Sequence, residues 1–188
     1  MRCASLERVQ HRYDSRTGSV ARQFDHICAV LSNLAIFSRY GNSAGHGDYQ
    51  LTERGQLLRH LYSELDLVLA QAIDDGAFDG LNACELASVV ASLVFEARRG
   101  GGGEPRRYPG GIQGNVAVCA AQLKGVHASI AMLCEDHMLE EPRQLDFGIT
   151  DIVYDWAQGE SLSQVLYGTD LTGGDSCVRQ RLATCFSR

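Results

Sequence analysis

Residues 82–97 (NACELASVVASLVFEA) show most plainly which class of fold the chain adopts. Asn82 stands three residues before Glu85, the spacing of a capping box, in which each side chain accepts a hydrogen bond from the other residue's backbone N–H. Apolar residues then recur at helical spacing: Leu86, Val89, Val90, Leu93, Val94 and Ala97. The segment therefore predicts an amphipathic helix that begins at Asn82 and buries one face.

Other segments repeat this spacing of apolar residues and are predicted to be helices. They cover residues 19–36, 53–75, 113–138 and 146–158, with a shorter helix at 161–167 and a final one after Gly173. A glycine-rich turn and a short strand, Tyr49–Leu51, separate the first two helices, which is the outline of the end of a winged helix. We therefore expect an all-α fold, with a winged-helix-like remnant over residues 1–52 and a helical bundle over residues 53–188.

Composition narrows the classes of function. The chain has 188 residues, of which 45% are apolar and 21% charged, and this fits one folded domain with or without a small appendage. Lys124 is the only lysine among 17 basic residues, and it is not part of a G-x-x-x-x-G-K-[ST] phosphate loop. The net charge of −6 argues against a general nucleic-acid coat, because such a protein needs a basic surface along the phosphates.

The cysteines and the first residues indicate a cytoplasmic protein. Seven cysteines without a C-x-x-C pair, in a chain with no apolar signal-like start, are typical of reduced thiols. No apolar run approaches the ~18 residues of a membrane span, so no membrane partner is expected. Cys134 and His137 suggest a metal site or a catalytic pair. Because Cys134 falls on the apolar stripe of its helix, however, we expect a buried structural cysteine and no metal.

Three segments, taken in their order and spacing, resemble one protein family. They are Leu51–Leu67, Gly80–Arg98, and Val153–Leu162 followed by Thr169–Asp175, the third with its tyrosine–aspartate–tryptophan–glycine pattern. Together they resemble the DSHCT domain, the C-terminal helical domain of superkiller-type DExH-box RNA helicases, and in particular its actinobacterial HelY-type group. The resemblance covers roughly residues 17–175 and implies the end of a winged helix followed by a helical bundle.

The resemblance also implies an accessory role. In this family two RecA-like domains hydrolyse ATP, while the helical domain closes over the channel, contacts single-stranded RNA and supports unwinding. This sequence has no Walker A motif, and Cys134-Glu-Asp-His137 lacks the first Asp of a D-E-x-H motif. We therefore expect no cofactor in this chain, ATP and magnesium belonging to the core of a parent helicase. The expected partners are single-stranded RNA and RecA-like core domains, in cis or in trans, and the chain is expected to be a fragment.

Two residues match family positions that contact RNA. Asp66 resembles a channel-facing acid on the first long helix, and Arg179 resembles a base-contacting arginine on the last helix. Without the resemblance, each is more simply a solvated residue. The sequence departs from the family beside Arg179, where Ser176–Cys177 replaces one bulky apolar residue and the following stripe is lost. The last helix is therefore expected to be atypical or truncated. A shifted reading frame or a truncation of the gene would produce such an end.

Further candidates and alternatives remain open at this point. Arg98 and Arg99, with Arg106 and Arg107, flank a glycine-rich linker and are candidates to hold RNA phosphates, solvated arginines being the alternative. Trp156 is expected in the core, base stacking being its alternative. A stand-alone helical adaptor that binds nucleic acid or protein, and a small-molecule enzyme, are the other functions considered. Because the net charge is negative, any RNA binding is expected to be weak and sensitive to salt.

We predict that this chain on its own hydrolyses no ATP, because its one lysine is not placed to reach the terminal phosphates. Phosphate release from highly purified protein, with and without single-stranded RNA, measures this directly. RNA-stimulated turnover of ATP would contradict the prediction.

Overall fold

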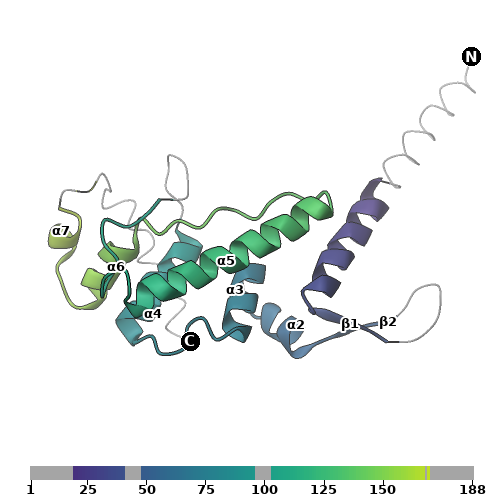
Figure 1. Cartoon of the computed structure of the whole chain (residues 1–188), viewed down its shortest axis with the longest axis horizontal. Coiled ribbons are helices and arrows are strands. Elements are labelled where there is room, and N and C mark those ends of the chain that lie inside the picture. Colours follow the sequence, from purple (N-terminus) through teal and green to yellow (C-terminus); the bar gives the residue numbers. More distant parts are fainter. Residues whose placement is uncertain (1–18, 41–47, 96–102, 168, 170–188) are drawn as a thin grey trace, which may run out of the picture. The chain divides into compact units, whose positions relative to one another are not determined.

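The computed structural model describes residues 19–40, 48–95, 103–167 and 169, and most of these are helical. A helix over residues 19–33 precedes β1 (Phe37–Tyr40), β2 (Asp48–Leu51) and α2 (Glu53–Leu58). The later helices, drawn in Figure 1, are α3 (Asp66–Asp74), α4 (Ala83–Val94), α5 (Asn115–Asp136), α6 (Thr150–Ala157) and α7 (Leu162–Val165). The all-α prediction is confirmed, and the expected final helix lies outside the described residues.

The chain divides into two compact units. The first gathers the described residues up to Leu57 together with Ala131–Glu141, and the second gathers Leu58–Ile130 with the described residues from Pro142 onward. The helix α5 therefore supplies residues to both units. The predicted division into residues 1–52 and 53–188 stays a prediction.

In the first unit, a β-hairpin joins the helix over residues 19–33 to α2. β1 and β2 pair antiparallel with Phe37 opposite Leu51, and the rings of Phe37 and Tyr49 lie 5.8 Å apart. The strand predicted at Tyr49–Leu51 is confirmed. Its partner β1 was not predicted, because Phe37–Tyr40 lacks the regular alternation of apolar and polar residues that signals a strand. The winged-helix-like interpretation of this hairpin stays a prediction.

Thr52 fixes the hairpin to the start of α2. Its hydroxyl donates a hydrogen bond to the carbonyl of Ala35 at 2.6 Å and accepts one from the N–H of Gly55 at 3.1 Å, as a helix-capping residue does. Gly55 allows α2 to approach the backbone of Ile36 closely, because a Cβ at this position would clash with the carbonyl oxygen of Ile36.

The prediction of one continuous helix over residues 53–75 is wrong. α2 ends at Leu58 and α3 begins at Asp66. The cause lies at Ser63, whose hydroxyl accepts a hydrogen bond from the N–H of Leu65 and whose carbonyl accepts one from the N–H of Asp66, both at 3.2 Å. Such local hydrogen bonds compete with those of a helix. The apolar stripe nevertheless runs across the break, since Leu65 is buried.

α4 begins as the sequence predicted and packs against α6 in the second unit. Asn82 accepts hydrogen bonds from the N–H groups of Cys84 and Glu85, each at 3.0 Å, and the Glu85 carboxylate accepts one from the N–H of Asn82 at 2.9 Å. One apolar cluster contains buried residues of α4, α6 and α7 and of the positions that cap α4 and α6: Ala91, Phe95, Ile149, Ile152, Val153 and Val165. Removal of this surface from water is the main stabilisation of the pair.

α5 agrees with the helix predicted over residues 113–138. Cys134 lies on its buried side, 7% exposed, and burial raises the pKa of its thiol, so the prediction of a structural cysteine is confirmed. By length and composition alone, α5 is also the one helix in the described ranges that could cross a membrane. α5 contains no long uninterrupted apolar run, because Lys124 and small polar residues interrupt its sequence.

The prediction that Trp156 belongs to the core is wrong, because 37% of this residue is exposed. α6 starts at Thr150 rather than near residue 146, and its buried residues fall in its first turn. Trp156 lies in the last turn of the helix, beyond Ile152 and Val153, which are the residues of α6 that belong to the apolar cluster.

Arg143 connects the segment before α6 to the C-terminal end of α4. Its Nη1 donates to the carbonyl of Phe95 at 2.8 Å and its Nη2 to that of Leu93 at 2.9 Å. Nε lies 3.0 Å from Oε2 of Glu64, and the carbonyl of Arg143 is 2.9 Å from Nε2 of His127. A cation at this end of a helix satisfies carbonyl groups that have no partner within the helix.

Replacing Arg143 by alanine is expected to lower the free energy of unfolding by about 3 kcal/mol, since two charge-assisted hydrogen bonds to backbone carbonyls are lost. The variant Arg143→Lys, which reaches one carbonyl at a time, is expected to lose about half as much. Urea unfolding followed by circular dichroism measures both. A loss below about 1 kcal/mol for Arg143→Ala would contradict this role.

Candidate nucleic-acid interface

Of the four residues predicted to contact RNA, Asp66 is the one that the structure describes. Arg98, Arg99 and Arg179 lie outside the described residues, and their roles stay predictions. The candidate groups that the structure describes are therefore Asp66 and the arginines that follow the glycine-rich linker.

Asp66 is the first residue of α3, and its carboxylate caps that helix. Oδ1 accepts a hydrogen bond from the N–H of Leu67 at 2.7 Å. The preceding residue, Leu65, stands at the N-cap position, and its side chain makes no capping hydrogen bond. Burial raises the pKa of the Asp66 carboxyl, and the bond from Leu67 opposes that rise. Tyr62, in the turn before α3, is 96% exposed. A carboxylate in this place can accept hydrogen bonds from ribose hydroxyl or base amino groups.

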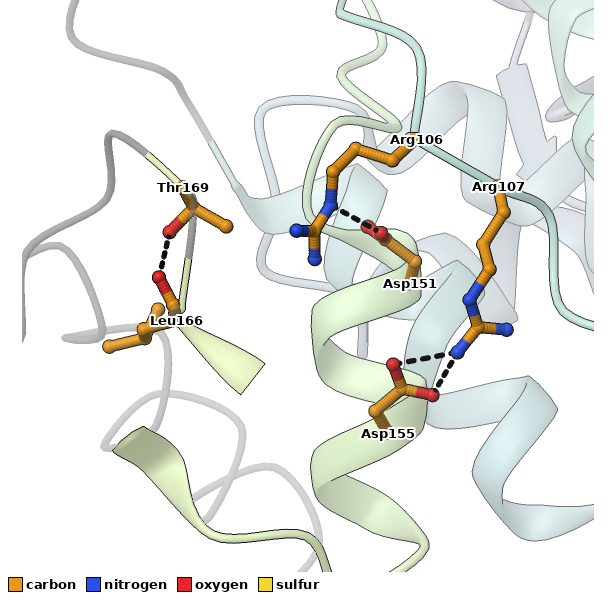
Figure 2. Close-up of polar contacts among 6 residues, drawn as sticks. All are labelled: Arg106, Arg107, Asp151, Asp155, Leu166 and Thr169. Carbon is orange, nitrogen blue, oxygen red and sulfur yellow. Dashed lines mark hydrogen bonds and ion pairs between the residues drawn. The ribbon is translucent and has the colours of Figure 1, made fainter. Parts of the chain in front are cut away.

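Arg106 and Arg107 form a second cluster with α6, which Figure 2 shows. Nε of Arg106 donates a hydrogen bond to Oδ2 of Asp151 at 3.0 Å. Nη2 of Arg107 lies 2.5 and 2.7 Å from the two carboxylate oxygens of Asp155. The two acids stand one helical turn apart, so both carboxylates lie on the same side of α6. Figure 2 also shows Thr169 donating to the carbonyl of Leu166, at 2.8 Å, just after α7.

The segment that carries these arginines is fixed to α5 and to the start of the α6 region. The carbonyl of Gly103 accepts a hydrogen bond from the N–H of Phe147 at 2.9 Å. Lys124 of α5 forms an ion pair with Glu104, which lowers the pKa of that carboxyl, and lies 5.1 Å from the ring centre of Phe147. The Tyr108 hydroxyl donates a hydrogen bond to Glu104 at 2.6 Å, and burial raises the pKa of the Tyr108 hydroxyl.

These contacts change the electrostatic expectation for the linker. Arg106, Arg107 and Lys124 are each paired with a carboxylate, so the described residues after the linker carry no excess positive charge. Arg106 and Arg107, for which solvation was the alternative to phosphate binding, each form an ion pair, and both side chains are more than half exposed. The spacing of Asp151 and Asp155 was visible in the sequence, but only the fold shows which cations they meet. In the described ranges, no group of three or more His, Cys, Asp or Glu is placed to hold a metal ion.

A model of the DSHCT (NUC185) domain family matches residues 48–182, more than half of the chain. The chain belongs to the DSHCT domain family. The match runs from β2 through α7, so Asp66 and the arginine cluster on α6 lie within the DSHCT domain. The resemblance drawn from the three sequence segments is confirmed.

This DSHCT domain is similar to part of two curated mycobacterial proteins, each named "Probable helicase HelY". That of Mycobacterium tuberculosis (strain ATCC 25618 / H37Rv) is 28% identical over 174 residues, which cover 92% of this chain and 18% of the relative. That of Mycobacterium leprae (strain TN) is 31% identical over 171 residues, which cover 88% of this chain and 17% of the relative. The chain therefore spans less than a fifth of the length of these relatives.

Replacing Asp66 by asparagine is expected to stabilise the protein more at neutral pH than in acid. Because its pKa in the folded chain is raised above the ordinary 3.8, the folded state binds this proton more tightly than the unfolded state does. The wild type thus loses stability as the pH rises from 3.8 through the raised pKa, and Asp66→Asn, which keeps an oxygen for Leu67, loses none there.

Urea unfolding of both proteins between pH 3.5 and 7 measures this effect, with the exposed Asp136→Asn variant as a control for the removal of one negative charge. An advantage of Asp66→Asn that shrinks as the pH rises would contradict the expected sign.

Proposed function

We propose that this chain is the C-terminal accessory domain of an ATP-dependent DExH-box RNA helicase, where it contacts single-stranded RNA and supports unwinding. The observation that carries the proposal is the DSHCT family match over residues 48–182, together with similarity to proteins named as helicases over most of the chain. Both relatives are more than five times longer than the matched segment, and the ATPase and its magnesium are assigned to the part that this chain does not span.

Asp66 is the residue proposed to meet the RNA directly. Its position at the start of α3 fixes the carboxylate, because one oxygen is held by the N–H of Leu67. A fixed acceptor suits contact with sugar or base donors better than contact with phosphates, which a carboxylate repels. Tyr62, four residues before Asp66 in the sequence, has an exposed ring that suits stacking on a base, and such stacking tolerates any sequence. This site therefore supports recognition of unpaired RNA rather than general attraction to a polyanion.

The test compares Asp66→Ala with Asp136→Ala, in the protein as it is expressed from its own gene. Asp136 is an exposed aspartate at the last residue of α5, so its replacement removes the same charge at a residue that is not proposed to contact RNA. Fluorescence anisotropy with a labelled single-stranded RNA measures affinity, and strand displacement measures unwinding. We expect Asp66→Ala to weaken RNA affinity about fivefold or more through the loss of a charged hydrogen-bond acceptor, with Asp136→Ala unchanged.

Equal behaviour of the two variants would contradict the role of Asp66. A wild-type protein that binds no single-stranded RNA, or that binds duplex DNA in preference, would contradict the proposed function and favour a stand-alone adaptor.

A further inference from the structure

Arg106 and Arg107 are neighbours in sequence, but the structure holds them in different ways. Arg107 uses one terminal nitrogen, Nη2, to contact both oxygens of Asp155. Arg106 uses Nε and contacts a single oxygen of Asp151. In Figure 2 the two terminal nitrogens of Arg106 point away from Asp151, and within the described part of the chain they make no hydrogen bond. Among the residues that the structure describes, the outer edge of this guanidinium therefore has no partner.

Asp151 is an unusual partner for a half-exposed arginine. Its side chain is 2% exposed, whereas 53% of the Arg106 side chain is exposed. Oδ1 of Asp151 is buried and has no hydrogen-bond partner among the described residues. A buried carboxylate oxygen without a partner is costly, and a second N–H from Arg106 would have satisfied it. The terminal nitrogens of Arg106 therefore face outward, and the second oxygen of Asp151 is left without a hydrogen bond among the described residues.

Both sides of this contact are fixed in place. Asp151 belongs to the first turn of α6, whose neighbours Ile152 and Val153 are buried in the cluster shared with α4. The Arg106 backbone lies between Gly103, bonded to Phe147, and the buried Pro109. A cation held at a rigid position loses little side-chain entropy when a ligand binds its free edge.

We propose that Arg106 is a further RNA contact of this domain, binding one backbone phosphate through Nη1 and Nη2 while Asp151 holds its Nε. Two parallel N–H groups match two oxygens of a phosphate, which is the geometry that arginine offers and lysine does not. Arg107 is the less favourable of the two arginines, because its Nη2 already contacts both oxygens of Asp155, and the hydrogen bond to Asp155, with the charges of Asp155, Asp151 and Glu160, raises its pKa. The inference rests on the proposed function, since the phosphate is that of the bound RNA strand.

The direction in which Asp151→Asn changes RNA affinity distinguishes a positioned arginine from general electrostatic attraction. Asp151→Asn removes a negative charge, so general electrostatics predicts tighter RNA binding, whereas loss of the contact that orients Arg106 predicts weaker binding. Asp155→Asn removes the same charge one turn away and serves as the matched control. Arg106→Ala and Arg107→Ala make the second matched pair, and both replace exposed side chains, so they test the inference even if Asp151→Asn fails to fold.

The experiment measures anisotropy of a labelled single-stranded RNA over a series of salt concentrations, with the intact protein and thermal unfolding as a check on each variant. We expect Arg106→Ala to weaken binding about fivefold and to reduce the slope of log K against log salt by about 0.7, the value for one phosphate of a single strand. Arg106→Lys is expected to fall between wild type and Arg106→Ala, and Arg107→Ala to change affinity less than about twofold.

Competition with inorganic triphosphate separates a strand-bound phosphate from a free one. We expect the triphosphate to displace the RNA from wild type no better than from Arg106→Ala. Equal losses in Arg106→Ala and Arg107→Ala, or tighter binding by Asp151→Asn, would overturn the inference and leave the proposed function standing. A wild-type protein that binds no single-stranded RNA would overturn both.

Discussion

The end of α4 depends on Arg143. This one side chain donates to the carbonyls of Leu93 and Phe95, and it starts the segment that continues through buried Leu145 and Phe147 into α6. The apolar cluster between α4 and α6 then adds further contacts between this segment and α4. Hydrogen bonding sets where the segment runs, and the burial of apolar surface supplies most of the stabilisation. Asp151 and Asp155 are in place on α6 because this packing holds the helix.

Arginine serves throughout the described residues as a structural connector, which gives a physical reason for a chain with a single lysine. Arg54 donates to the carbonyl of Leu34, Arg143 to two carbonyls, and Arg107 to a carboxylate. Each contact uses the fixed directions of guanidinium N–H groups, which an ammonium cannot reproduce. The same contacts consume positive charge that would otherwise attract RNA. If the domain contacts RNA as proposed, that contact depends on single placed groups.

Local signals in the sequence predicted a large part of the fold. The capping box at Asn82 and Glu85, the short helix that follows Ser161, and the buried side of α5 all follow from short-range patterns that the structure reproduces. The break at Ser63 could not be predicted in this way, because the apolar stripe continues across it and only hydrogen bonds to Ser63 reveal it. The exposure of Trp156 depends on where α6 begins, a boundary that apolar spacing places poorly.

The candidate site was predictable to a smaller extent. Asp66 was found through family resemblance, and its capping of α3 was hidden by the expectation of a longer helix. The contacts of Arg106 and Arg107 join residues more than forty positions apart, so no local pattern could have assigned their partners. Family membership came from the joint order of three segments, since any one amphipathic helix occurs in many unrelated proteins.

The most direct test of an accessory role in a helicase is the size at which this chain occurs in the cell. Lysate separated by size under native conditions, with peptides from residues 48–167 located by mass spectrometry and RNA-stimulated ATPase assayed in each fraction, measures it. A role within a helicase predicts that these peptides occur in a species several-fold larger than 188 residues, together with ATPase activity. Peptides confined to a species of the size expected for 188 residues, with no ATPase in the same fractions, would contradict it.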